Sequence, residues 1–302
     1  MSFRVSVVIV TRDRADVLAR CLDSILRQTP QPDEIIVVAG NEESFPEDLR
    51  LRYAAQHLIL ACCNEPNISK ARNIGLEHAS GEIVIFIDDD AIAHERWVAA
   101  YTDAFEQDPG AWAAGGSVLD ARTDPPSPEF AHGLIHPSGR QVETRDPNQY
   151  AARHGYRPSV KGCNFALRLD RIPGTMRFDP FFAFAFDEAD LIMAIHEEGG
   201  GVIAVPGAVV DHLHAPGAYR SDGPLDRDWY REFASHTRFM RKHSNGIWAC
   251  VGWFVVLCRL GMHAARVLAA AVQRKITIKR AKACIADAIS GVRRGSSSHG
   301  TA

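Results

Sequence analysis

Residues 82–90 read EIVIFIDDD, an apolar run that ends on three consecutive carboxylates. The five apolar residues after Glu82 are typical of a strand buried on both faces, as in a parallel sheet. Adjacent carboxylates repel one another, so a divalent cation would stabilise them at the edge of a core. Because alternate residues of an extended chain point the same way, Asp88 and Asp90 could share one metal ion while Asp89 faces away. A solvated, Asp-rich turn is the competing interpretation.

The chain before this stretch alternates between strands and helices. The predicted strands are 4–10, 34–39 and 58–60, and the predicted helices are 15–28 and 69–79. This alternation is typical of a parallel α/β sheet, whose ligands bind outside the carboxyl ends of the strands. Both residues 11–14 (TRDR) and the aspartates lie at such ends, so the sequence predicts a ligand site there.

The pattern is less regular beyond residue 90. The predicted helices are 94–106 and 187–197, and the predicted strands are 112–118, 161–169, 202–205 and 208–210. Residues 120–160 are rich in Pro, Gly, His and Arg and show no clear periodicity. A structureless stretch of this length is usually functional or mobile.

Length and composition are those of an ordinary globular protein. With 302 residues, 46% apolar and 24% charged, the chain can bury a large core, and we expect one large domain with an appendage. A net charge of −3 argues against a nucleic-acid-binding protein. Seven cysteines without a CxxC pair indicate reduced thiols in a cytoplasmic protein. The first apolar segment is short and is followed by charge, so we expect no signal peptide.

Five ordered blocks of the sequence resemble the family 2 glycosyltransferases, which have the GT-A fold. They are SVVIVTRDRADVLARCLDSIL (6–26), NISKARNIGLEHASGEIVIFIDDD (67–90), GCNFALR (162–168), FDPFFAFAFDEADL (178–191) and VVDHLH (209–214). The resemblance implies a Rossmann-like, mostly parallel sheet flanked by helices, with a nucleotide-sugar half at 1–118 and an acceptor half at 119–240. It also implies transfer of a sugar from a nucleoside diphosphate sugar to an acceptor hydroxyl, with inversion.

The resemblance implies a metal centre at the aspartates. A divalent cation that bridges the two donor phosphates would neutralise the charge of the leaving group. Asp88 and Asp90 suit this task as hard oxygen ligands, and the family places a metal-contacting histidine where this chain has His212. His214 is the alternative. Two carboxylates and one imidazole suit Mn²⁺ or Mg²⁺.

The acidic pair at the start of the 187–197 helix matches the place where the family carries its catalytic base. An acceptor hydroxyl is too weakly acidic to attack without a carboxylate that takes its proton. We expect Glu188 to be this base. Asp187 is the alternative, because this chain has Asp-Glu where Glu-Asp is the more familiar order in the family. Asp190 would orient the helix start or an acceptor hydroxyl, and Asn164 would contact a sugar hydroxyl.

Donor-binding positions of the family match residues after the first strand, in ARNIG and in the aspartate run. They are Thr11, Arg12, Asp13, Arg72, Asn73, Asp88 and Asp89. An arginine such as Arg72 suits bidentate contact with a phosphate. The second strand ends at Ala39, where the family commonly has an Asp that contacts the base. UDP is the first expectation for the nucleotide, and dTDP or GDP are the alternatives.

Residues 241–302 are expected to form a helical, partly basic appendage with a disordered tail near 296–298. The apolar run 247–272 is long enough to span a bilayer, but Arg259, His263 and Arg266 share one helical face, which favours an interfacial or packed helix. Residues 273–294 carry seven basic residues against one acidic, which favours peripheral contact with an anionic, cytoplasmic membrane surface and a lipid-linked acceptor. Packing on the catalytic domain or on a second subunit is the alternative, and the acceptor could also be a sugar or a small molecule.

Two other classes of function compete with glycosyl transfer. A nucleotidyltransferase also uses an α/β sheet and a metal held by carboxylates, but it would carry a Gly-rich phosphate loop, and residues 11–14 contain no Gly. A non-catalytic nucleotide-sugar-binding protein could use the same scaffold. Loss of the metal or base motif would point to it, and this chain has both motifs.

Overall fold

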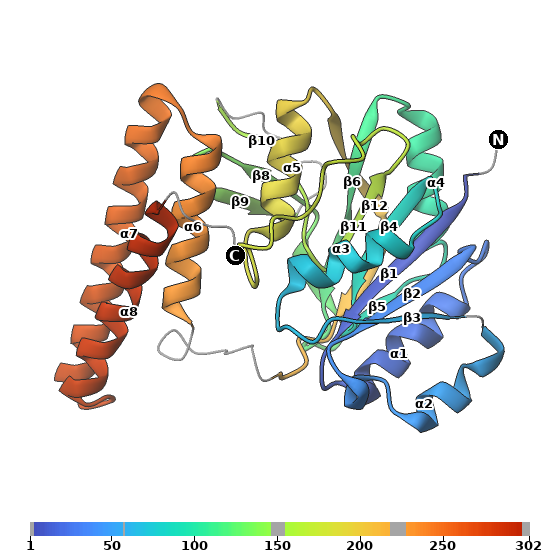
Figure 1. Cartoon of the computed structure of the whole chain (residues 1–302), viewed down its shortest axis with the longest axis horizontal. Helices are drawn as coiled ribbons and strands as arrows, with labels where there is room; N and C mark the ends of the chain where they lie inside the picture. Colours follow the sequence, from blue (N-terminus) through green and yellow to red (C-terminus); the bar gives the residue numbers. More distant parts are fainter. Residues whose placement is uncertain (1–2, 57, 146–154, 218–227, 298–302) are drawn as a thin grey trace. The chain divides into compact units, whose positions relative to one another are not determined.

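The computed structural model describes residues 3–56, 58–145, 155–217 and 228–297 (Figure 1). Contacts divide the chain into two compact units. The first consists of Met1–Ile135, Val142–Ala183 and Asp187–Ala215, and the second of His136–Gln141, Phe184–Phe186 and Pro216–Ala302. The predicted bounds of the catalytic domain, 1–240, stay a prediction, and the first unit ends at Ala215. Part of the expected disordered tail lies outside the described residues.

The first unit is built on one mixed sheet with the strand order β3-β2-β1-β4-β11-β6-β12-β5, and β7 pairs with β6. The strands are β1 (Val5–Thr11), β2 (Glu34–Ala39), β3 (Ile59–Cys62), β4 (Ile83–Asp88), β5 (Ala91–Ala93), β6 (Ala111–Asp120), β7 (Ser127–Phe130), β11 (Asn164–Arg168) and β12 (Gly201–His212). The run β3-β2-β1-β4 is parallel, and β11 joins it to β6 by antiparallel pairing on both sides. The predicted α/β class is confirmed, and the parallel pairings are those within β3-β2-β1-β4 and between β6 and β12.

Helices cover both faces of this sheet, which explains why its central strands are apolar throughout (Figure 1). Val7 and Ile9 of β1 pack with α1 (Ala15–Leu26) and α4 (Trp97–Gln107) in one core cluster. Val8 faces the other way and packs with α3 (Ile68–His78) and α5 (Asp187–Glu197). Each fully buried Val or Ile contributes about 1.5–3 kcal/mol relative to an exposed one.

The expectation of a structureless stretch at 120–160 is wrong for its described part. Besides β7, the stretch contains β8 (His132–Ile135), β9 (Gln141–Thr144) and β10 (Arg157–Ser159), which form a separate sheet in the order β10-β8-β9. These strands have three or four residues each, too few for a visible alternation. The two short strands predicted at 202–205 and 208–210 are one strand, β12, with a register shift between Val205 and Val209. The turn helix α2 (Glu47–Arg52) was not predicted.

In its described residues, the second unit contains the helices α6 (Trp229–His243), α7 (Gly246–Val272) and α8 (Ile278–Ser296). Phe233, Met240, Val256 and Ala288 form its core. Helices α6 and α8 approach closely at Gly291, which has no side chain. A Cβ atom there would lie 2.2 Å from the carbonyl oxygen of Tyr230. The predicted C-terminal helical appendage is therefore present.

Candidate metal centre and active site

The three aspartates lie where β4 ends and the chain turns into β5. Asp88, Asp90 and His212 each place one ligand atom within 4.8 Å of the others. The antiparallel pairing of β12 with β5 sets His212 opposite Ala91, next to the aspartates, with Nε2 3.5 Å from the Asp90 Oδ1. Two carboxylate oxygens and one imidazole nitrogen fit a hard divalent cation such as Mn²⁺ or Mg²⁺.

Asp89 has a different environment from its neighbours. It is fully buried and accepts hydrogen bonds from the Thr11 hydroxyl, at 2.7 Å, and from the Arg14 guanidinium. Burial raises the pKa of Asp89 to about 7, although Arg14 and Thr11 act in the opposite direction. Arg14 also donates to Asp90 at 3.2 Å, so an arginine offsets part of the repulsion among the carboxylates. Sequence reasoning named the turn that holds Arg14 but not this residue.

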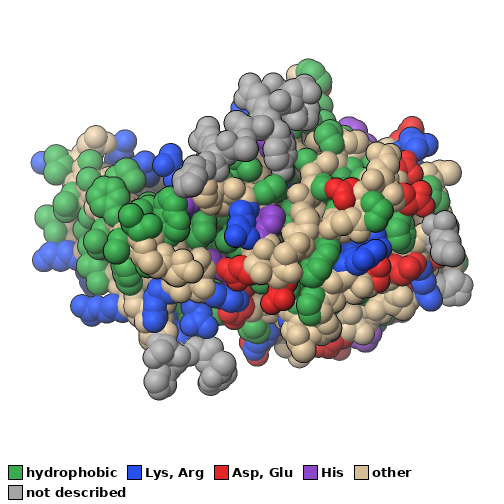
Figure 2. Space-filling view, turned by 90° about the horizontal axis from the view of Figure 1, so that it is seen from above, with side chains coloured by type: hydrophobic (Ala, Val, Ile, Leu, Met, Phe, Trp, Pro, Cys, Tyr) green, Lys and Arg blue, Asp and Glu red, His purple; other side chains and the backbone are tan. Residues whose placement is uncertain are grey.

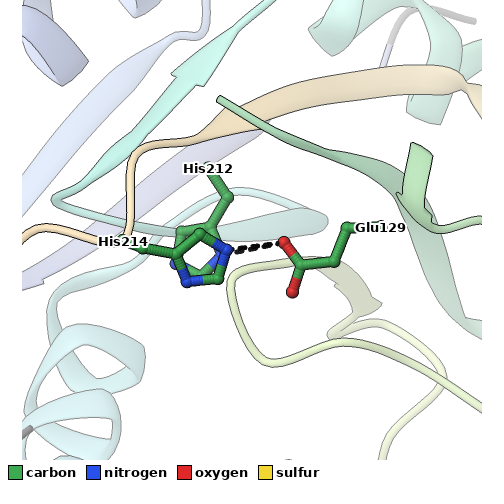
Figure 3. A group of neighbouring side chains, drawn as sticks. All are labelled: Glu129, His212 and His214. Atoms are coloured by element: carbon green, nitrogen blue, oxygen red, sulfur yellow. Dashed lines mark hydrogen bonds and ion pairs between the residues drawn. The ribbon is translucent and has the colours of Figure 1, made fainter. Parts of the chain in front are cut away.

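A second group of ligand atoms adjoins the first (Figure 3). Glu129, on β7, lies 2.8 Å from the Nε2 of His214 and 3.5 Å from the Nδ1 of His212. The two imidazole rings overlap, with their centroids 3.9 Å apart. His212 therefore lies between Asp90 on one side and Glu129 on the other. Sequence reasoning missed Glu129, because nothing in its local sequence links it to the distant histidines.

The charges around His212 determine its protonation. Burial alone would lower the pKa of His212, but the carboxylates of Asp90 and Glu129 outweigh burial and raise this pKa to about 9. Burial likewise tends to raise the pKa of Glu129, and its interactions with both histidines lower it to about 2 instead. A metal that uses His212 must therefore displace a proton from its ring at neutral pH.

Arg72 connects the aspartates to the acidic pair. Its side chain, on α3, is buried and forms an ion pair with Asp187, the first residue of α5. It also lies 3.5 Å from the Oδ1 of Asp88 and donates to the carbonyl of Gly162 at 2.6 Å. The guanidinium stacks over the ring of Phe165, 5.2 Å from its centroid. One cation therefore bridges a proposed metal ligand and a proposed catalytic carboxylate.

Glu188 is the half-buried member of the acidic pair. Burial and the neighbouring charge of Asp187 raise the pKa of Glu188, and Arg72 offsets part of this increase. A Cβ atom at Gly162 would lie 3.3 Å from the Glu188 carboxyl carbon, so the glycine leaves space beside this carboxylate. A raised pKa and adjacent free space suit a group that accepts a proton.

Comparison with known proteins assigns the chain to a family. Residues 6–158, half of the chain, match the family described as Glycosyl transferase family 2. The chain belongs to this family. The family 2 protein is 37% identical over 121 residues to a glucosyl-dolichyl phosphate glucuronosyltransferase of Haloferax volcanii, a match over 38% of each chain. It is 22% identical over 243 residues to the O-antigen biosynthesis protein RfbC of Myxococcus xanthus, which covers 77% of this chain and 19% of RfbC.

Solved structures share the fold of the family 2 protein. GalNAc-T7, solved with UDP, GalNAc and Mn²⁺, superposes with a TM-score of 0.62 at 18% identity, over 80% of this chain and 48% of that chain. The mannosyltransferase PcManGT from Pyrobaculum calidifontis, solved with GDP-Man and Mn²⁺, has a TM-score of 0.56 at 16% identity, over 98% of this chain and 87% of that chain. At these identities the likeness concerns the fold, which confirms the expected GT-A architecture.

The predicted nucleoside-side residues of the family 2 protein lie at the carboxyl end of β1. Arg12 donates to the carbonyl of Cys63 at 2.9 Å, and its side chain crosses Gly40, where a Cβ atom would lie 2.5 Å from the Arg12 Nε. Asp13 has a left-handed backbone with φ of 58° and accepts a hydrogen bond from Asn41 at 2.7 Å. Thr11 is engaged with Asp89, as described above.

Three other predicted residues of the family 2 protein are involved in packing. Asn164 is fully buried, and its amide oxygen accepts from Trp97 and Tyr101 while its nitrogen donates to the carbonyls of Ser117 and Ala208. These four bonds use its whole hydrogen-bonding capacity, so the side chain is not directed at a sugar. Asn73 exchanges two hydrogen bonds with the backbone of Phe178, and Asp190 is buried in α5.

Proposed function

We propose that the protein transfers a sugar from a nucleoside diphosphate sugar to an acceptor hydroxyl, in a metal-dependent reaction that inverts the anomeric centre. The observation that carries the proposal is the ion-pair chain from Asp88 through Arg72 to Asp187, which joins the metal-ligand group to the acidic pair. Family membership and the glycosyltransferase names of the relatives support it. The matches span only 38% and 19% of the first two curated relatives, so their own substrates are not carried over.

Asp88, Asp90 and His212 would hold the cation. Once bound, Mn²⁺ or Mg²⁺ would supply Lewis acidity to the donor diphosphate. Mn²⁺ is the first expectation, because both structural neighbours were solved with it. Asp89 and Arg14 would hold the turn that carries Asp88 and Asp90, because the Asp89 carboxylate is engaged in hydrogen bonds with Thr11 and Arg14.

Glu188 would act as the base. Asp187 is neutralised by Arg72, which leaves Glu188 as the carboxylate available for proton transfer. The acceptor oxygen attacks the anomeric carbon and its proton passes to Glu188, while the bond from that carbon to the diphosphate oxygen breaks and the nucleoside diphosphate leaves. One displacement of this kind inverts the centre.

Replacing Glu188 with Gln tests this assignment. We expect Glu188→Gln to abolish transfer while a nucleotide and Mn²⁺ still raise the melting temperature, because a ligand of the native state stabilises it. The thermal-shift panel contains UDP-, dTDP- and GDP-sugars with and without Mn²⁺. UDP is our first expectation, and dTDP and GDP are included because Ala39 stands where the family commonly has its base-contacting carboxylate. Full turnover by the variant would move the base elsewhere. A lack of metal-dependent stabilisation by every nucleotide would overturn the proposed function.

We further propose that the protein contacts an anionic membrane surface peripherally, on the cytoplasmic face. The α7 stripe, a row of exposed large apolar residues along α7, consists of Ile247, Phe254, Leu257, Met262, Leu268 and Val272. Helix α7 is long and apolar enough to cross a membrane, and only 22% of its most apolar window is buried. Figure 2 shows apolar side chains gathered on the helical unit (left), with Lys and Arg side chains around them.

Charge favours surface contact over spanning. Residues 229–296 carry thirteen Lys and Arg against two Asp and Glu, in a chain whose net charge is −3. Of the three polar residues predicted to share a face, Arg259 contacts Glu232, His263 is buried against Trp229, and Arg266 is exposed. Because α7 uses its other side to pack on α6 and α8, we expect it to lie in the plane of the interface.

Co-sedimentation with vesicles tests this location. We expect binding to phosphatidylglycerol-containing vesicles that weakens with salt, and little binding to neutral vesicles. Ile247→Glu should reduce binding, whereas Leu51→Glu, at an apolar position of the first unit that is 69% exposed against 73% for Ile247, should leave it unchanged. Equal loss in both variants, or no vesicle binding by the full chain, would contradict the proposal.

A further inference from the structure

The second unit, which contains α6, α7 and α8, has a cavity of about 460 Å³ that the proposed chemistry does not use. Its walls come from the loop at 139–141, from Phe186, and from one side each of α6 and α7. The lining combines apolar side chains, among them Phe186, Phe254 and Met262 (the apolar wall), with the cationic Arg140 and Arg259 and their polar neighbours (the polar wall). An apolar cavity with a few convergent polar groups is typical of a ligand site.

Hydrogen bonds fix the polar wall of this cavity. His236 donates from Nε2 to the carbonyl of Ser138 at 2.9 Å and accepts at Nδ1 from Arg259 at 2.7 Å. Glu232 accepts from the same guanidinium at 3.1 Å. Burial and the charge of Arg259 lower the pKa of His236 to about 4, so this ring is neutral near pH 7. Arg259 is thus held in one orientation before any ligand arrives.

Arg140 adds a second guanidinium to the cavity. Its side chain is exposed, and within the described residues it forms no ion pair. The cavity lining therefore carries two arginines against one carboxylate, Glu232. This charge balance favours an anion, and guanidinium groups suit phosphate oxygens in particular.

The apolar wall continues onto the surface, and one of its residues precedes the acidic pair in the sequence. Phe254 and Met262 are members of the α7 stripe and are 68% and 53% exposed, so the cavity lining is continuous with exposed apolar surface. Phe186 has a left-handed backbone with φ of 68° and stacks on His236 with centroids 5.5 Å apart. This conformation is unusual for a bulky residue. Phe186 directly precedes Asp187, so the cavity wall and the acidic pair are consecutive in the chain.

We propose that this cavity binds the phosphate group of a lipid phosphate, with its hydrocarbon chain against Phe254 and Met262, the two members of the α7 stripe that line the cavity. A neutral sugar would not need two guanidinium groups, and a free phosphate would leave the apolar wall in contact with water. A ligand with both an anionic head and an apolar chain satisfies both walls. Resting on the proposed function, the cavity would select a lipid-phosphate-linked acceptor.

Calorimetric titration of the full chain with farnesyl phosphate tests the site without donor or metal. We expect farnesyl phosphate to bind about tenfold or more tightly than farnesol or inorganic phosphate, because each comparator satisfies only one wall. Similar affinity for farnesyl phosphate and inorganic phosphate, or no binding of farnesyl phosphate, would overturn the proposal.

Two exposed positions of the α7 stripe provide a matched pair of variants. Met262 lines the cavity and Leu268 does not, and their exposed fractions are 53% and 54%. Met262→Glu should weaken farnesyl phosphate binding by about tenfold or more, and so should Arg140→Glu, whereas Leu268→Glu should retain wild-type affinity. Equal affinities of the Met262 and Leu268 variants would place the lipid elsewhere on α7 and refute the cavity as its site.

The same samples separate this inference from the proposed function. A thermal shift by nucleotide and Mn²⁺ reports on the donor site, and farnesyl phosphate binding reports on the cavity. Lipid phosphate binding without any nucleotide response would refute the transferase assignment and retain the cavity. Nucleotide response without lipid phosphate binding would do the reverse.

Discussion

Replacing Arg72 with Met should destabilise the first unit strongly. Arg72 is 3% exposed, pairs with Asp187 and lies 3.5 Å from Asp88. Methionine has a similar length and keeps much of the packing against Phe165, so the variant removes mainly the charge. It leaves the buried Asp187 carboxylate without its counter-ion.

The size of the effect follows from this burial. Removing one partner of a buried ion pair costs about 3–5 kcal/mol, because the other charge stays desolvated. Adding Asp187→Asn removes that charge and should recover part of the loss, with a coupling energy of about 1–3 kcal/mol. The control is Lys70→Met on the same helix, since Lys70 pairs with Glu65 at 2.6 Å but both side chains are exposed. That variant should cost less than about 1 kcal/mol.

Urea unfolding followed by circular dichroism measures these free energies. Hydrogen exchange of the β4 amides identifies the transition of the first unit, since the two units could unfold separately. The reasoning is refuted if Arg72→Met costs no more than Lys70→Met, or if the Arg72 and Asp187 substitutions are additive.

Three further predictions concern the site and its support. Mn²⁺ affinity should rise about tenfold per pH unit between about pH 6 and pH 8, because the metal must displace the proton that His212 holds below its pKa of about 9. The His212→Gln variant should bind Mn²⁺ more weakly, with an affinity that depends less on pH. An unchanged pH dependence in this variant would exclude His212 as a ligand. On the acid side, kcat/KM should fall with a midpoint above the ordinary glutamate pKa of about 4.3, because the base must be ionised and burial and Asp187 raise the pKa of Glu188. A kcat/KM that stays constant down to about pH 5 would contradict this. Asn164→Leu should lower the free energy of unfolding by about 3 kcal/mol or more, because it leaves the Trp97 indole N–H and the Tyr101 hydroxyl without their acceptor. A variant that stays stable but binds sugar poorly would instead support the contact with a sugar hydroxyl that the sequence suggested.

The central sheet could be predicted because its signals are local. In β1 and β4, Val and Ile occupy both faces of each strand, and polar turns mark where the strands end. The short strands β5 and β7 lack such signals, because three or four residues show no periodicity and their pairing partners lie far away in the chain.

The site could be predicted only in part, for a related reason. Asp88 and Asp90 follow one another in sequence, so their proximity is visible there. The sequence could not choose between His212 and His214, whereas the register of β12 against β5 brings His212 beside the aspartates and leaves His214 with Glu129. The alternation argument for Asp89 reaches its limit at Asp88, where β4 ends, and the turn that follows directs both Asp89 and Asp90 toward Arg14.

Arg72 has a consequence for how variants of this protein are interpreted. The Arg72 guanidinium is the counter-ion of both Asp88 and Asp187. Neutralising Asp88 therefore leaves the positive charge of Arg72 to the acidic pair alone. An inactive Asp88→Asn variant would then combine a lost metal ligand with a changed proton affinity at Glu188, and the two effects would share one kinetic phenotype. His212 contacts Asp90 and Glu129 instead, so its substitution tests a metal ligand without altering either counter-charge of Arg72.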